Sequence, residues 1–163
     1  MNIKRLAIDA VLTAAALALF VIEAQLPPPA AVPGIKLGLS NIVILIAVYT
    51  MGKRDAAVIL LLRVTLGSIF AGTVTAFMFS AAGGLCSFLV MCLLSRFMKG
   101  NRIWAVSVFG ALAHNMGQLA AASVLLESAK VLWYFPALVL SALVTGAVTG
   151  ICAQYVVKRG VKG

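Results

Sequence analysis

The stretch from Arg96 to Leu126 reads RFMKGNRIWAVSVFGALAHNMGQLAAASVLL, and it shows the pattern that decides the fold. A short joint carries Arg96, Lys99 and Arg102, and the apolar run 103–126 follows without another charged residue. A helix that spans a membrane needs about 20 predominantly apolar residues. The run is therefore predicted to cross a bilayer, with its cationic joint held at one surface.

Apolar runs separated by short joints continue through the whole chain. The runs predict six helices, at about 6–26, 40–51, 55–70, 74–97, 103–126 and 131–157. Only 10% of the 163 residues are charged and the mean hydropathy is +1.12, whereas a soluble domain has about 25% charged residues. We predict an all-α integral membrane protein, a bundle of six transmembrane helices in lipid, that forms a single domain over residues 1–163.

The distribution of cations predicts the orientation of this bundle. Most Lys and Arg residues lie near the two termini or in the second and fourth joints: Lys4, Arg5, Lys53, Arg54, Arg96, Lys99, Arg102, Lys158, Arg159 and Lys162. Cationic loops resist translocation and stay in the cytoplasm. Both termini are therefore predicted to be cytoplasmic in a multi-pass plasma-membrane protein, and the net charge of +9 requires no nucleic-acid partner.

Arg63 is predicted to lie near mid-membrane, within the third helix. Ionisable residues at that depth are costly and often functional. The four acidic residues of the chain all lie nearer to helix ends. The guanidinium could therefore bond backbone carbonyls or water in a structural role, or it could bind an anionic ligand such as a phosphate.

The fifth helix carries His114, Asn115 and Gln118 within five residues. Such polar side chains must face the bundle interior or a wet cavity. They predict either an interhelical hydrogen-bond network or a pocket for a small molecule. No metal is expected, because the chain has a single histidine and no well-placed thiol.

A third candidate group lies in the outer loop that leads into the second helix, where Lys36 precedes Ser40 and Asn41. A cation beside a helix N-terminus suits an anion. The alternative is a capped turn that returns the chain to the membrane.

Small residues recur at four-residue spacing in three helices: Ala10, Ala14 and Ala18; Gly117 and Ala121; Ala142, Gly146 and Gly150. In lipid such stripes allow close helix packing. Packing within the bundle is favoured for the last two stripes, whereas the first could equally contact a partner protein.

No enzymatic centre is expected. The acids are scattered, no phosphate-binding lysine loop is present, and the histidine has no serine or cysteine nucleophile near it in sequence.

Two segments carry a family resemblance, namely VPGIKLGLSNIV from Val32 to Val43 and AHNMGQL from Ala113 to Leu119. Both resemble the bacterial Gx transporter family, whose older label is heptaprenyl diphosphate synthase component I. More distantly, the chain looks like the six-helix S-components of energy-coupling factor (ECF) transporters.

The resemblance implies a function and a set of site residues. The function would be transport or binding of a flavin (FAD, FMN or riboflavin) as substrate, with no cofactor. The ligand would contact Lys36, Ser40, Asn41, Arg63, His114, Asn115 and Gln118. Ala10, Ala14 and Ala18 would dock an ECF-type coupling subunit. The other partner that the resemblance implies is a flavin-dependent redox complex.

Two alternatives remain open. The first is a non-catalytic membrane partner of a polyprenyl (heptaprenyl) diphosphate synthase, or a carrier of a prenyl diphosphate. Chain elongation itself needs aspartate clusters that hold Mg²⁺, and this chain has none. The second is a structural subunit of a membrane redox complex.

Overall fold

The computed structural model describes residues 3–25 and 36–160, and in these ranges it is helical without any strand. The helices are α1 (Ile3–Ala24), α2 (Asn41–Thr50), α3 (Lys53–Ala71), α4 (Val74–Leu94), α5 (Ile103–Leu125) and α6 (Phe135–Gly160). Two short 3-10 helices, η1 (Gly100–Arg102) and η2 (Ala129–Tyr134), precede α5 and α6. The predicted all-α class and the count of six helices are confirmed. The predicted end of the first helix at Leu26 and most of the predicted outer loop lie outside the described residues.

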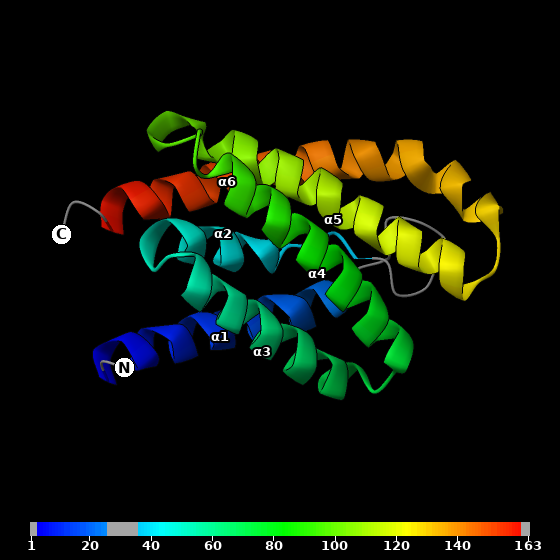
Figure 1. Ribbon diagram of the computed structural model, residues 1–163, viewed down its shortest axis with the longest axis horizontal. Coiled ribbons are helices and arrows are strands. Elements are labelled where there is room, and N and C mark those ends of the chain that lie inside the picture. The colour runs from blue at the N-terminus through cyan, green and yellow to red at the C-terminus, as the bar shows by residue number, and fades with distance from the viewer. Residues whose placement is uncertain (1–2, 26–35, 161–163) are drawn as a thin grey trace.

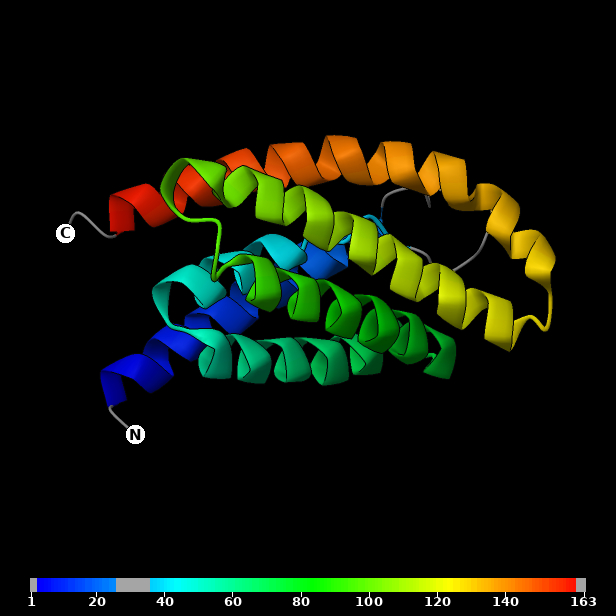
Figure 2. The same cartoon turned by 45° about the horizontal axis from the view of Figure 1, so that its top comes forward.

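The chain runs back and forth between two ends of one bundle (Figure 1). Both termini and the α2–α3 and α4–α5 joints lie at one end, and the α3–α4 and α5–α6 joints lie at the other. The turned view shows α5 and α6 side by side along one face, with α1 on the opposite side of the bundle (Figure 2). The joints that carry most of the cations therefore share one end of the molecule.

Four segments are long and apolar enough to cross a membrane: α1, α4, Gly100–Leu125 and Ala129–Gly160. α2 is apolar but has only 10 residues, and α3 does not meet the same criterion. The outer face of α6 is apolar along its length, since Leu140 and Val144 are both 66% exposed and Ile151 is 60% exposed. This surface suits lipid rather than water.

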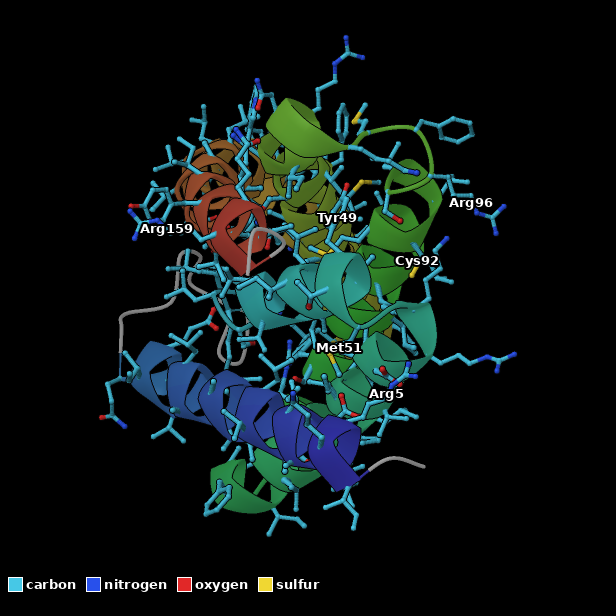
Figure 3. All side chains as sticks on the ribbon, turned by 90° about the vertical axis from the view of Figure 1, so that its left-hand side faces the viewer. Arg5, Tyr49, Met51, Cys92, Arg96 and Arg159 are labelled. Carbon is cyan, nitrogen blue, oxygen red and sulfur yellow. The ribbon has the colours of Figure 1, made fainter. Side chains whose placement is uncertain are left out.

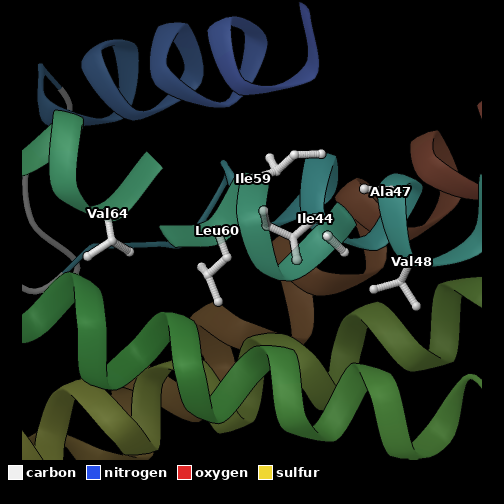
Figure 4. Close-up of a cluster of buried hydrophobic side chains, with 7 residues drawn as sticks. Ile44, Ala47, Val48, Ile59, Leu60 and Val64 are labelled. Atoms are coloured by element: carbon white, nitrogen blue, oxygen red, sulfur yellow. The ribbon is translucent and has the colours of Figure 1, made fainter. Parts of the chain in front are cut away.

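α2 is short and enclosed by the other helices, since it packs against α1, α3, α4, α5 and α6. A helix that is apolar on all sides is typically buried. Its contact with α3 forms a core cluster of Ile44, Ala47, Val48, Ala56, Ile59, Leu60 and Val64, most of which Figure 4 labels.

Glycines allow α6 and α5 to approach closely. A β-carbon at Gly146 would lie 2.7 Å from Cα of Val108, and one at Gly150 would lie 2.7 Å from Cα of Trp104. A β-carbon at Gly117 would lie 2.6 Å from the carbonyl oxygen of Ala82 on α4. The small-residue stripes of α5 and α6 therefore serve packing within the bundle.

The start of the last helix differs from the predicted position near residue 131. Residues 129–134 form η2, and α6 begins only at Phe135. Pro136 explains the shift, because proline is tolerated in the first turn of a helix but removes a hydrogen bond farther inside. The hydroxyl of Ser128 accepts a hydrogen bond from the backbone N–H of Lys130 and caps the 3-10 segment.

Candidate functional site: a buried polar centre

Side chains from four helices and one loop converge between α1, α3, α4 and α5. They surround a cavity of only about 10 Å³, lined by Phe20, Glu23, Lys36, Gly38, Ser40, Arg63, Ser80, His114 and Gln118. A cavity needs roughly 10–15 Å³ to hold one water molecule. Of the seven predicted ligand-binding residues, five line this space, namely Lys36, Ser40, Arg63, His114 and Gln118. The centre is thus polar and nearly closed.

Arg63 is the core of this group and is only 1% exposed. Its Nη1 donates to the hydroxyl of Ser80 on α4 at 2.8 Å, and its Nη2 donates to Oδ1 of Asn41 at 2.9 Å. The guanidinium carbon lies 6.0 Å from the ring centroid of Phe20 on α1. The Nε atom has no partner among the described residues. Arg63 therefore ties α3 to α2 and α4 through neutral oxygens.

Glu23 is a central residue that the sequence analysis did not select. It lies near the end of α1, yet it is only 4% exposed. Its carboxylate accepts the backbone N–H groups of Gly38 and Leu39, the second at 3.1 Å. A carboxylate that receives two N–H donors holds the loop strongly. The sequence feature that could have indicated this role is an acidic residue at the end of an apolar helix, next to a proline-rich segment.

Lys36 is the cation of the loop and lies over the ring of Phe20. Its Nζ is 3.4 Å from the ring centroid, a cation–π contact. Its backbone N–H donates to Oε1 of Gln118 on α5 at 3.2 Å. Burial lowers the pKa of Lys36, the negative charge of Glu23 opposes that shift, and the positive charge of Arg63 adds to it. The loop thus brings a second cation close to Arg63.

The ring of His114 is held between two glycines. A β-carbon at Gly83 on α4 would lie 2.8 Å from Cε1 of His114, and one at Gly38 would lie 2.9 Å from Cδ2. Gly38 also has φ +80°, a conformation that side chains disfavour. Neither ring nitrogen has a hydrogen-bond partner in the described part of the chain. The close approach of these two glycines therefore fixes the position of the ring.

The remaining predicted residues occupy other positions. α2 begins at Asn41, as expected for this turn, but the Ser40 side chain forms no cap. Asn41 directs Oδ1 to Arg63, and its Nδ2 has no partner among the described residues. Asn115 is not in the lining, because its Nδ2 donates to the carbonyl oxygen of Leu138 on α6 at 2.8 Å. Asn115 thus joins α5 to α6, which is the network role that the sequence left open for it.

The alanine stripe of α1 faces away from the bundle. Ala10, Ala14 and Ala18 are exposed, whereas the buried face of this helix carries Thr13, Ala16, Phe20 and Glu23. The stripe therefore takes no part in packing within the described residues, and it remains available to lipid or to a partner.

The chemistry of the centre is that of hydrogen bonding and charge. Among residues 3–25 and 36–160, no three His, Cys, Asp or Glu side chains gather as a metal would require. The cavity of about 10 Å³ has no room for a flavin ring in this conformation, since pockets for drug-sized ligands hold about 300–1,000 Å³. The visible effect of the arrangement is to bind α1, the loop, α3, α4 and α5 together.

Comparison with known proteins identifies one family. Residues 12–156 match the model of the family described as heptaprenyl diphosphate synthase component I. No curated protein and no solved structure matches the chain.

Proposed function

The chain belongs to the heptaprenyl diphosphate synthase component I family, and we propose from this that it is the membrane subunit of a polyprenyl diphosphate synthase. It is not itself an enzyme, as the sequence predicted, because component I is the non-catalytic part of such a synthase. The family match over residues 12–156 is the observation that carries the proposal.

The structure adds two supporting features. Four segments are long and apolar enough to span a bilayer, which suits a subunit that anchors a partner at the membrane. The polar centre encloses only about 10 Å³, so its residues serve better as interhelical links than as a site for a large ligand. In this role Arg63 and Glu23 stabilise the scaffold.

We propose further that all six helices lie within the membrane and that both termini are cytoplasmic. The enclosure of α2 by its neighbours explains how a 10-residue helix could lie at membrane depth without spanning it alone. The cationic end of the bundle would then face the cytoplasm. A soluble catalytic subunit would approach from that side, and the exposed face of α1 with Ala10, Ala14 and Ala18 would offer a surface for close packing within the membrane.

The test is co-expression of the tagged chain with the catalytic polyprenyl synthase subunit of the same organism. The catalytic subunit should be captured with the tagged chain in detergent, and its synthase activity should sediment with membranes only when the chain is present. A catalytic subunit that stays soluble and is not captured would contradict the proposal. A membrane protein of similar size carrying the same tag serves as the control.

A second candidate is an S-component-like carrier of a small polar molecule. The observation that favours it is a set of buried polar atoms around the cavity that have no hydrogen-bond partner among residues 3–25 and 36–160: Arg63 Nε, Asn41 Nδ2 and both ring nitrogens of His114. Neither the structure nor the family match supports a flavin as that molecule. Mass spectrometry and the absorbance of the purified protein discriminate, because a carrier would co-purify with a small water-soluble molecule and a scaffold would not.

A further inference from the structure

A second cavity, far larger than the polar centre, lies at the end of the bundle that holds both termini. Its volume is about 1050 Å³, and it lies between the end of α2, the α2–α3 joint, the segment that joins α4 to α5, and the last turns of α6. Figure 3 looks onto this end, with Tyr49 near the centre of the view and the side chains of Arg159 on α6 and Arg96 after α4 directed outward on either side. Pockets for drug-sized ligands hold about 300–1,000 Å³, so this space is large enough for a sizeable molecule.

Five cations line this cavity: Lys53, Arg96, Lys99, Lys158 and Arg159. No Asp or Glu stands among the described lining residues to balance them. The nearest acid in sequence, Asp55, is engaged elsewhere, because its Oδ2 accepts a hydrogen bond from Nε of Arg5 at 2.7 Å. Like charges that share one cavity repel, and an anion bound among them would relieve that repulsion.

The cavity also has an apolar side. Val48, Ile103 and Val157 are buried side chains in its lining, and the rings of Tyr49 and Tyr155 stand beside them. The guanidinium of Arg159 lies over the Tyr155 ring, 4.3 Å from its centroid, and this cation–π contact holds one cation beside an aromatic ring of the lining. A ligand that fills this space would present an anionic head to the cations and hydrocarbon to the valines and isoleucine.

Retention of cations in the cytoplasm explains why basic residues occur at this end but not why these five surround one cavity. Arg54 and Arg102 belong to the same joints, yet they do not line it. The two groups provide a comparison within the chain, because both are subject to the same topological bias and only one faces the space.

We propose that this cavity binds the head group of an amphiphile that carries a phosphate or diphosphate. Lys and Arg side chains would bond the phosphate oxygens, and the apolar side would hold the start of the hydrocarbon tail. Two sources share this chemistry, a prenyl diphosphate and an anionic phospholipid of the cytoplasmic leaflet. The first rests on the proposed function, because a catalytic subunit docked at this end would release a product with this chemistry beside the cavity.

The experiment uses the full chain in detergent and native mass spectrometry to count bound molecules. The probes are heptaprenyl diphosphate, heptaprenol, which lacks the diphosphate, phosphatidylglycerol and phosphatidylcholine. The test variant is R96Q/K99Q, and the control is R54Q/R102Q, which removes the same amount of charge from the same end of the bundle at positions outside the cavity lining. All four positions are exposed, and size-exclusion chromatography checks that both variants fold.

We expect the wild-type chain to retain at least one phosphate-bearing probe in preference to its uncharged or zwitterionic counterpart. R96Q/K99Q should weaken that binding about tenfold or more, because each bond to a charged group contributes strongly, while the control should change it less than about twofold. The proposal would be overturned if both variants lost binding equally. It would also be overturned if the wild-type chain retained heptaprenol as well as heptaprenyl diphosphate and retained the two phospholipids equally.

The probes also separate the two sources. Preference for heptaprenyl diphosphate, with displacement by inorganic diphosphate, would identify the product of a synthase. Retention of phosphatidylglycerol alone would support the site and assign it to lipid. Capture of the catalytic subunit is measured separately on the same variants. A chain that captures the catalytic subunit but binds none of the probes contradicts only this inference. A chain that binds a probe but does not capture the catalytic subunit contradicts only the proposed synthase partnership.

Discussion

Arg63 on α3 and Asn41 at the start of α2 are joined by a hydrogen bond of 2.9 Å from Nη2 to Oδ1. Both side chains are buried, with exposures of 1% and 5%. The bond connects α3, which carries the buried guanidinium, to α2, which the other helices enclose. The stability of the fold should therefore depend on Arg63 more than on any cation at the surface.

Replacing Arg63 by Met should destabilise the protein strongly. The change keeps an apolar stem but leaves Asn41 and Ser80 without their donor. A buried polar group that loses its hydrogen-bond partner costs about 1–3 kcal/mol. Thermal unfolding in detergent should show a large drop for R63M and almost none for the exposed control R54M. A variant R63M as stable as the wild type would show that Arg63 has no structural role.

Glu23→Gln should destabilise the contact between α1 and the loop. The amide keeps one oxygen acceptor but places an NH₂ group against a backbone N–H of Gly38 or Leu39. An unsatisfied buried donor costs about 1–3 kcal/mol. The same substitution at exposed Glu127 should leave the unfolding temperature unchanged. Equal behaviour of the two variants would mean that the Glu23 carboxylate does not hold the loop.

Two glycines of α6 provide a matched pair for the packing against α5. Gly150→Ala would place a β-carbon 2.7 Å from backbone atoms of Trp104, whereas a β-carbon at Gly160 meets nothing within 4 Å. Overpacking typically costs about 1–3 kcal/mol. G150A should therefore lower the unfolding temperature, and G160A should leave it unchanged or raise it slightly. Tolerance of G150A would show that α5 and α6 can separate without loss.

The exposed stripe of α1 predicts a variant that affects assembly alone. Ala14→Leu adds bulk on an outward face and should leave the stability of the isolated chain unchanged while reducing capture of a membrane-embedded or docked partner. Ala142→Leu is the contrasting control, because Ala142 is fully buried and a larger side chain there should destabilise the fold. Normal capture by A14L would remove this face from the docking surface.

The sequence predicted the helices well because apolar runs and cationic joints are local signals. It placed the start of the last helix too early, because the residues around Val131 are apolar and resemble the start of a helix. Pro136 is tolerated only in the first turn of a helix, and α6 accordingly begins at Phe135. The enclosure of α2 could not be predicted from its composition alone, since an apolar helix reads the same whether lipid or protein surrounds it.

The polar centre was partly predictable. Arg63, His114 and Gln118 had to face the interior because lipid would not solvate them, and all three line the cavity. The role of Glu23 depends on how the loop folds back over the end of α1, which is a long-range relationship. The direction of the Asn115 side chain depends on how α5 is rotated about its axis. Asn115 lies one residue after His114, and its amide therefore points to the carbonyl oxygen of Leu138 rather than into the cavity.

The hydrogen bonds of Arg63 also bear on how the protein is made. α3 is not among the segments that are long and apolar enough to span a membrane alone, and it carries this guanidinium near its middle. The insertion machinery should not release such a segment into lipid by itself. Ser80 on α4 and Asn41 on α2 supply the oxygens that Arg63 bonds. The proposal that all six helices lie in the membrane therefore predicts that α3 and α4 enter the bilayer together as a hairpin during translation, after α2 has been synthesised.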